Sequence, residues 1–314
     1  MPDEISIGGV CRLADRGVIR ARGADAATFL QSQLTNDVAS LGAGSARLAG
    51  FCSAKGRLQA SFIVWRPTDD EFLLSCPTDV LAPTLKRLSM FVLRAKCKLS
   101  DASDEIALFG VAGPAATATA MLGDGAVWQR GSHAGATAIR LPDAAGLQRA
   151  LLAAPIAAEV DVGAAPAMTV ATWRWLEVES GIVTIEAATV DRFVPQMVNF
   201  ELVGGVDFQK GCYPGQEVVA RSQYRGTTKR RTLLFDCDSV PAEGNDVFVA
   251  GDVNEPAGTV AYAAPHPSRR GGSALVEVRL AAIGDELRLG APDGPLLTRR
   301  ELPYPVPIDA AVAS

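Results

Sequence analysis

The sequence is poor in the residues that build metal sites and disulfide frameworks. It contains two histidines, His133 and His266, and its six cysteines are dispersed without a Cys-x-x-Cys pair. Such spacing indicates neither a disulfide framework nor a zinc ribbon. We therefore expect no stable protein-held metal site.

Long apolar runs and a basic leader are also missing. The first residues are acidic, and no uninterrupted apolar segment reaches the ~18 residues needed to cross a bilayer. We expect a cytoplasmic protein with no membrane partner. The formal net charge of -5 argues against coating of nucleic acid through overall charge, although a local basic patch could still hold an anion.

Patterns typical of helices and strands alternate in the first hundred residues. Asp25 can cap a helix over 26–34, and Thr78 opens a longer helix with a buried apolar face. Period-two alternation predicts a strand over 57–65 and a pairing strand over 71–76. A short strand over 97–100 follows.

The alternation of helix and strand patterns continues to about residue 231, and after it only strand patterns are found. We expect strands over 106–112 and 136–141, a helix starting at Pro114, and a helix over 143–154. After Arg231, short β-prone runs alternate with turn residues, which predicts a small β-barrel. The fold class is α+β, and the expected divisions are 1–100, 101–230 and 231–314.

The chemistry is expected in a turn-rich segment that leads into a short helix. Its order is Lys210-Gly211-Cys212-Tyr213-Pro214-Gly215-Gln216-Glu217. Pro214 fits a helix start, so Cys212 would lie just before a helix N-terminus and beside Lys210, a setting that favours the thiolate. Cys212 is thus a candidate nucleophile or metal ligand. The alternative is a buried apolar Cys212 and a solvated Lys210.

Glycines and cations surround this segment. Four glycines lie within twelve residues and would let the backbone approach a ligand closely; they are Gly204, Gly205, Gly211 and Gly215. Five cations without an acid follow, namely Arg221, Arg225, Lys229, Arg230 and Arg231. They form either a solvated basic face or a site for an anion such as a folate polyglutamate tail or an RNA backbone.

The segment 210–217 resembles the signature of the YgfZ family, Lys-Gly-Cys-[aromatic]-x-Gly-Gln-Glu. The resemblance extends to Phe193-Val194-Pro195-Gln196-Met197-Val198-Asn199, to Gly23-Ala24-Asp25 with Phe29-Leu30-Gln31, to Leu34-Thr35-Asn36-Asp37-Val38, and to Ala54-Lys55-Gly56-Arg57-Leu58. These motifs occur in family order and cover nearly the whole chain.

The resemblance implies a fold like that of the glycine-cleavage T protein, with ferredoxin-like halves, a C-terminal barrel and a central folate site. Family members bind tetrahydrofolate and support synthesis or repair of iron-sulfur clusters in client enzymes, including those that thiolate tRNA. The implied cofactor is therefore tetrahydrofolate or a C1-substituted folate. The implied partners are iron-sulfur enzymes or assembly proteins.

The resemblance also implies site residues. Lys210 and Cys212 are the candidates for catalysis; the candidates for folate binding are Glu179, Trp173, Gln196, Asn199, Tyr213, Gln216, Glu217 and Arg221. Glu179 resembles the carboxylate of the Glu-x-Gly segment that accepts N–H bonds from a pterin, and an indole such as Trp173 suits stacking. The alternatives are a solvated Glu179 and a core Trp173.

Two departures limit what the resemblance implies. The Asp pair of the glycine-cleavage T protein is replaced by Ala60 and Ser61, and Arg16 stands where some family members have a second folate-linked Trp. Three hypotheses stay open: a folate-binding accessory protein for iron-sulfur clusters, a folate-dependent aminomethyl- or methyl-transferase or demethylase, and an RNA-binding module. The missing Asp disfavours the second, and Tyr224 alone as a stacking aromatic disfavours the third.

Overall fold

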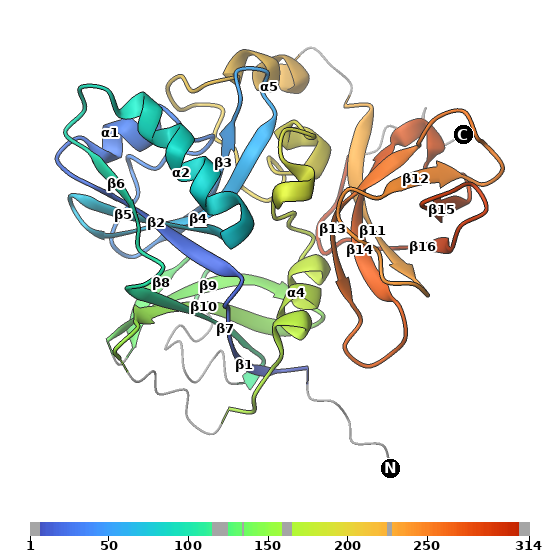
Figure 1. Cartoon of the computed structure of the whole chain (residues 1–314), viewed down its shortest axis with the longest axis horizontal. Coiled ribbons are helices and arrows are strands. Elements are labelled where there is room, and N and C mark those ends of the chain that lie inside the picture. The colour runs from blue at the N-terminus through green and yellow to red at the C-terminus, as the bar shows by residue number, and fades with distance from the viewer. Residues whose placement is uncertain (1–6, 115–124, 134, 159–164, 225–227, 308–314) are drawn as a thin grey trace.

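The computed structural model describes residues 7–114, 125–133, 135–158, 165–224 and 228–307. Two five-stranded antiparallel sheets pack together, and a closed six-stranded barrel lies beside them (Figure 1). The first sheet has the order β3-β4-β5-β2-β6, formed by β3 (Ala46–Cys52), β4 (Leu58–Thr68), β5 (Glu71–Pro77), β2 (Arg16–Arg22) and β6 (Lys98–Asp101).

Strand β4 is covered on both of its faces. Leu58, Ala60, Phe62 and Val64 are buried, as the alternation predicts; the last three pack in one core with α1 (Ala26–Gln31) and α2 (Thr78–Val92). Ser61 and Trp65 point to the other face, yet they are buried as well. The strand is therefore more enclosed than a half-buried strand, because the second sheet covers the face that carries Ser61.

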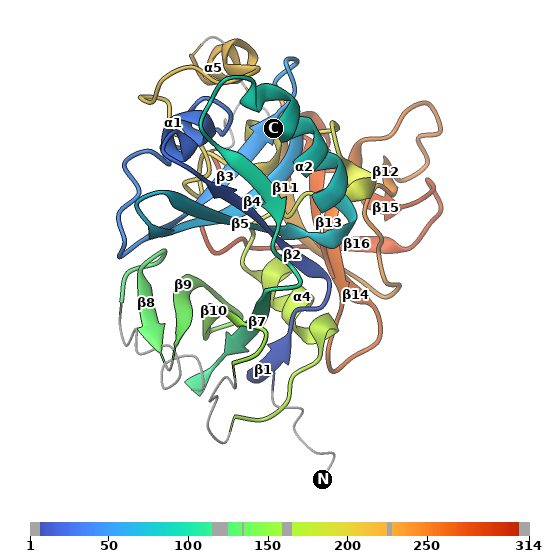
Figure 2. The same cartoon turned by 60° about the vertical axis from the view of Figure 1, so that its left-hand side comes forward.

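The second sheet has the order β1-β7-β10-β9-β8, with β1 (Gly9–Arg12), β7 (Ile106–Ala112), β10 (Leu147–Pro155), β9 (Ala136–Ala144) and β8 (Arg130–His133). Strand β1 comes from the N-terminus and pairs with β7, as the register Gly9↔Ala112 shows, and the two lie side by side in Figure 2. Strand β1 precedes the expected division at residue 100, yet it belongs to the sheet formed by the residues that follow that division.

The helix expected over 143–154 is wrong, because this segment forms the β9–β10 hairpin. Ala145 and Gly146 have φ of 50° and 74°, which makes a tight reversal after β9. Strand β10 then pairs with both β7 and β9, and buries both faces of an Ala- and Leu-rich segment. Tertiary pairing overrides helix propensity here. The helix expected to start at Pro114 lies largely outside the described residues.

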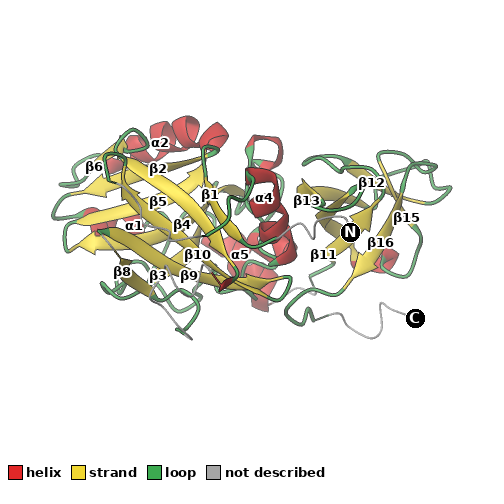
Figure 3. Ribbon diagram, turned by 90° about the horizontal axis from the view of Figure 1, so that it is seen from below, coloured by secondary structure: helices red, strands yellow, loops and turns green. Residues whose placement is uncertain are grey.

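Helix α4 (Val170–Glu179) lies between the second sheet and the barrel, as Figure 3 shows from below. The side chain of Thr169 caps it by accepting a hydrogen bond from the Thr172 N–H. Two short 3₁₀ turns, η1 (Ala187–Thr189) and η2 (Pro195–Val198), then lead to α5 (Gln216–Tyr224). This connection passes beside β4 and reaches the segment that the sequence marks as functional.

The expected C-terminal barrel is confirmed, and it is closed by six strands. Its strands are β11 (Arg230–Cys237), β14 (Gly272–Arg279), β13 (Gly258–Pro265), β12 (Asp246–Val249), β15 (Leu287–Leu289) and β16 (Leu296–Arg300). β16 closes the barrel by pairing with β11 and β15. Only Leu296 and Leu297 are apolar in β16, so this strand lacks the alternation of apolar and polar residues that is typical of a strand.

Within the described part of the chain, no helix combines the length and apolarity required to cross a membrane. The same residues contain no cluster of three or more His, Cys, Asp or Glu side chains placed to hold a metal ion.

Candidate functional site

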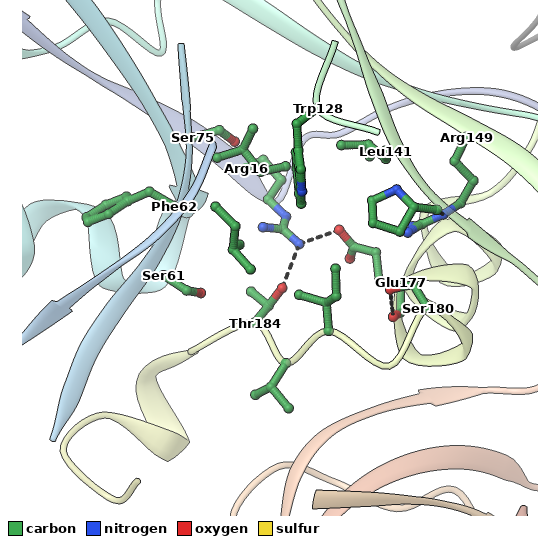
Figure 4. Close-up of a pocket in the computed structure, with 15 residues that line it drawn as sticks. Arg16, Ser61, Phe62, Ser75, Trp128, Leu141, Arg149, Glu177, Ser180 and Thr184 are labelled. Atoms are coloured by element: carbon green, nitrogen blue, oxygen red, sulfur yellow. Dashed lines mark hydrogen bonds and ion pairs between the residues drawn. The ribbon is translucent and has the colours of Figure 1, made fainter. Parts of the chain in front are cut away.

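A pocket lies at the junction of the two sheets and helix α4 (Figure 4). We call it the inner pocket; it has a free volume of about 40 Å³. It is lined by Arg16, Leu48, Ser61, Phe62, Ile63, Ser75, Trp128, Leu141, Pro142, Arg149, Glu177, Ser180, Ile182, Val183 and Thr184. Both sheets contribute walls, so the pocket exists only when the two halves are packed together.

Glu177 is the carboxylate among the described residues that line this pocket. It accepts hydrogen bonds from Arg16 at 2.5 Å and from the Tyr262 hydroxyl at 2.6 Å. Burial raises the pKa of Glu177, but Arg16 and Tyr262 outweigh it and bring this pKa below its ordinary value. Arg16 also donates to Thr184. The carboxylate is therefore charged and held in one orientation.

Arg149 enters the pocket from β10 with an unsatisfied hydrogen-bonding group. Its side chain is 2% exposed, and its Nε donates to the Pro142 carbonyl at 3.0 Å. Nη1 is buried and has no hydrogen-bond partner among the described residues. Burial lowers the pKa of this guanidinium to about 10. A buried donor without an acceptor is costly, so an acceptor supplied by a ligand would be favourable.

Trp173 packs against Arg149 and does not itself line the pocket. Its ring lies 5.3 Å from the Arg149 guanidinium carbon, in a cation–π contact. On its other side it lies against Gly110, where a β-carbon would come within 2.4 Å of the indole. Trp173 is 1% exposed. It therefore positions a pocket residue, and it is not itself exposed to a ligand in this pocket.

Trp128 and Leu48 separate the inner pocket from a second recess, which we call the outer groove. The outer groove has a free volume of about 510 Å³ and is lined by Asn36, Ala46, Arg47, Leu48, Trp128, Gly204, Val206, Asp207, Phe208 and Gln209. The main chain of Trp128 bonds to Ala46 and Arg140, one from each half, and its φ is 70°. Its side chain lies among the residues that line the inner pocket (Figure 4).

Residues from the first part of the segment 204–217 line the outer groove. Lys210 anchors this segment at the end of α1. Its ammonium donates to the Leu34 carbonyl at 2.7 Å and to the Gln31 carbonyl, just beyond the end of α1. It also lies 4.8 Å from the centre of the Tyr213 ring. Burial lowers the pKa of Lys210 to about 8. Lys210 is thus neither a solvated charge nor free to meet a ligand.

Two further motifs fix the same segment. Thr35 donates to the Gly205 carbonyl at 2.6 Å, and Asn36 donates to the Gly204 carbonyl at 2.7 Å. At the other end, Gly215 has φ of 80° and packs on the turn between β3 and β4; a β-carbon there would lie 2.4 Å from the Ser53 carbonyl oxygen. The close approach at Gly215 is therefore made to the main chain of Ser53 and Gly56.

Cys212 is the exposed thiol of the chain. Four of the six cysteines are buried and Cys97 is half-buried. Burial raises the pKa of Cys11, Cys52 and Cys76 to about 12. Cys212 lies between the anchored Lys210 and the buried Tyr213, and α5 begins four residues later. The sequence expectation of a thiol just before a helix is therefore met.

Comparison with known proteins places the chain in a family. The GCVT N-terminal domain model matches residues 8–123. The tRNA-modifying protein YgfZ of Edwardsiella ictaluri is 36% identical over 271 residues, which cover 79% of this chain and 78% of the relative. The chain belongs to the YgfZ family. The YgfZ of Colwellia psychrerythraea is 29% identical over 308 residues, 93% of this chain and 92% of the relative.

The fold of the chain is also found in a glycine-cleavage T protein. The glycine cleavage system aminomethyltransferase T from Bartonella henselae superposes with a TM-score of 0.73 at 18% identity, covering 94% of this chain and 86% of that one. The expectation of a glycine-cleavage T protein-like α+β fold is thus confirmed for this YgfZ family member.

The candidate carboxylate Glu179 lies on a different face of α4 from the inner pocket. Its two oxygens accept from Arg300 of β16, and Trp175, four residues earlier, donates to Ser273 of the barrel. Trp173 and Glu177 are also four residues apart and face the sheets. Helical periodicity could have found Glu177, because a step of two residues from Glu179 reverses the face.

The other candidates are distributed around the signature of this YgfZ family member. Gln196 and Asn199 are fully buried, and their amides donate to the carbonyls of Val219 and Thr232. Tyr213 is buried, Gln216 is half-buried, and Glu217 and Arg221 are exposed on α5. None of these candidates lines the inner pocket. Arg149 and Trp128 were missed because no local motif distinguishes them.

The basic stretch offers fewer free charges than the sequence indicates. Arg230 forms an ion pair with Glu277, and Arg231 forms one with Glu201. Arg225 lies outside the described residues, and Arg221 and Lys229 are exposed. At least two of the five cations therefore stabilise the barrel and its junction.

Substitution of Gly215 tests the packing of the signature segment. Gly215→Ala should lower the free energy of unfolding by about 3 kcal/mol, because it adds a steric conflict with Ser53 to the strain of a positive φ. Gly204→Ala, with φ of 76° and open space around it, should cost only ~1 kcal/mol. Equal losses in urea unfolding would contradict the packing described.

Lys210 should make stability depend on pH. Its pKa is about 8 in the folded protein and 10.5 ordinarily, so the unfolded chain binds more protons between these values. The free energy of unfolding contributed by this site should therefore rise as the pH increases from 8 to 10.5. Urea unfolding at pH 7.5, 9 and 10.5 should show the wild type gaining stability relative to Lys210→Met. Parallel pH dependence of the two proteins would exclude this titration.

Proposed function

We propose that the protein binds a reduced folate, with the pterin ring in the inner pocket and the rest of the molecule in the outer groove. The observation that carries the proposal is the unsatisfied Nη1 of Arg149 in the pocket that holds the Glu177 carboxylate. A pterin offers a carbonyl oxygen that can accept from Arg149 and a row of N–H groups that can donate to Glu177.

The hydrogen-bonding groups and the charge of the inner pocket fit a pterin ring. A carboxylate has about four acceptor positions, and Arg16 and Tyr262 use two of those of Glu177. The remaining positions suit the N–H groups of an aminopyrimidine edge. The two guanidinium groups and one carboxylate give the pocket a net positive charge, which favours an electron-rich ring with a carbonyl oxygen.

Entry of the ring requires a side-chain movement. Pockets for small molecules usually enclose ~300–1,000 Å³, whereas the inner pocket has about 40 Å³ and the outer groove about 510 Å³. Trp128 and Leu48 are shared by the two recesses, so displacement of these side chains would join them. The displaced indole could then stack on the ligand.

The geometry favours binding over C1 transfer. Ser61 occupies one position of the T-protein Asp pair, and its hydroxyl accepts a hydrogen bond from the Ile185 N–H. Glu177 is already paired with Arg16. A carboxylate fixed in this way is suited to orient a ring and not to take up a proton.

The folate-bound protein would act as an accessory factor for assembly or repair of iron-sulfur clusters in client enzymes, and so support tRNA modification indirectly. Two observations support this assignment. The relatives are named as tRNA-modifying proteins. Cys212 is the exposed thiol, and the residues just upstream of it line the outer groove.

Arg149→Met should weaken tetrahydrofolate binding by about 10- to 100-fold, because a hydrogen bond to a charged group contributes ~1.5–3 kcal/mol. Isothermal titration calorimetry with the full chain measures this effect. Arg12→Met is the matched control, since Arg12 lies over the Phe109 ring on the same sheet but is exposed and lines neither recess. Equal affinities of the Arg149 variant and the wild type would remove the inner pocket as the folate site.

Cys212→Ala should bind tetrahydrofolate as the wild type does but should not restore iron-sulfur enzyme activity in a deletion strain. Cys97→Ala, at a half-buried thiol, should restore it. Full rescue by Cys212→Ala would leave folate binding intact as a conclusion and exclude a role for this thiol.

A further inference from the structure

Helix α2 ends in an exposed apolar cluster. Met90 is 67% exposed, Phe91 40% and Leu93 88%. Leu93 has φ of 45°, which is an unfavourable conformation for a residue with a branched side chain. The backbone therefore holds a leucine in solvent at a conformational cost, and clustered exposed apolar groups commonly mark a binding surface.

Helix α2 lies on the outside of the first sheet (Figure 2), and a groove runs along it. It has a free volume of about 280 Å³ and is lined by Phe51, Gln59, Val80, Pro83, Thr84, Lys86, Arg87, Met90 and Val190. The α2 residues from Val80 to Met90 span three helical turns, which is a length of roughly 15 Å. The groove shares no lining residue with the inner pocket or the outer groove.

Two exposed cations, Lys86 and Arg87, line the groove, and three more follow in the chain just after α2. Residues 86–98 contain no Asp or Glu, and the cations of this segment are all exposed: Lys86, Arg87, Arg94, Lys96 and Lys98. Among the described residues, none of these five side chains forms an ion pair. The chain as a whole has a net charge of -5, so this local excess is set against the overall charge.

We infer that the α2 groove is the docking site for an acidic amphipathic helix of a partner protein. Apolar side chains of that helix would fill the groove beside Met90 and pack against Leu93. Its carboxylates would meet Lys86 and Arg87. A three-turn groove with cations along its edge fits this mode of recognition.

The concave shape distinguishes this occupant from others. A lipid surface is flat on this scale and would leave the groove unfilled. An RNA backbone would neutralise the cations but brings no apolar side chain to the groove or to Leu93. A protein helix satisfies both features.

The test uses the immobilised full-length protein and a phage-displayed library of random 16-residue peptides. Enriched peptides should carry net negative charge and apolar residues spaced three or four apart. Fluorescence anisotropy with an enriched peptide should give a Kd at least about tenfold higher for Leu93→Glu and for the double variant Lys86→Glu/Arg87→Glu. Val253→Glu, at an equally exposed apolar residue of the barrel, should bind the peptide as the wild type does.

All four proteins should bind tetrahydrofolate equally, so loss of peptide binding is separable from loss of the proposed folate site. The inference fails if no acidic peptide is enriched or if the Leu93 variant retains peptide binding. Selective binding of phosphatidylglycerol vesicles or of tRNA to this surface, without peptide enrichment, would assign it to a membrane or to RNA and would also overturn the inference.

Discussion

The ion pair between Arg16 and Glu177, completed by the Tyr262 hydroxyl, is the interaction on which the rest of the molecule depends. Arg16 belongs to the first sheet, Glu177 to the helix that covers the second, and Tyr262 to the barrel. A charge removed from water is tolerated only when its partners are well placed. The same contacts that satisfy Glu177 therefore fix the relative positions of three parts of the chain and shape the pocket at their junction.

The signature segment is shaped by a different constraint, namely hydrogen bonds and close contacts to main-chain carbonyls. Lys210, Thr35 and Asn36 bond to backbone carbonyls, and Gly215 lies against the Ser53 carbonyl. Most residues that look chemical in this motif thus have a structural task. Together these contacts hold the segment in which the Cys212 thiol is exposed.

Much of the fold could be predicted from the sequence, because periodicity and turn residues report local structure directly. The failure at 143–154 came from a segment whose composition suits a helix but which has strands on both sides. Within the site, the motif located Cys212 and its loop. It could not locate Arg149 or Trp128, since their position in the pocket comes from the packing of one half on the other. The resemblance to a Glu-x-Gly segment points to Glu179, whereas the carboxylate that lines the inner pocket is Glu177, two residues earlier on α4.

The pairing of β1 with β7 has a consequence for how the chain acquires its structure. Gly9 of β1 pairs with Ala112, about a hundred residues later, so β1 has no strand partner in this sheet until β7 has been synthesised. A fragment that ended near residue 100 would leave β1 unpaired, and the complementary fragment would expose the main-chain groups of β7 along an open sheet edge. The two halves are therefore one cooperative unit, and a chain interrupted between them is prone to association through that edge.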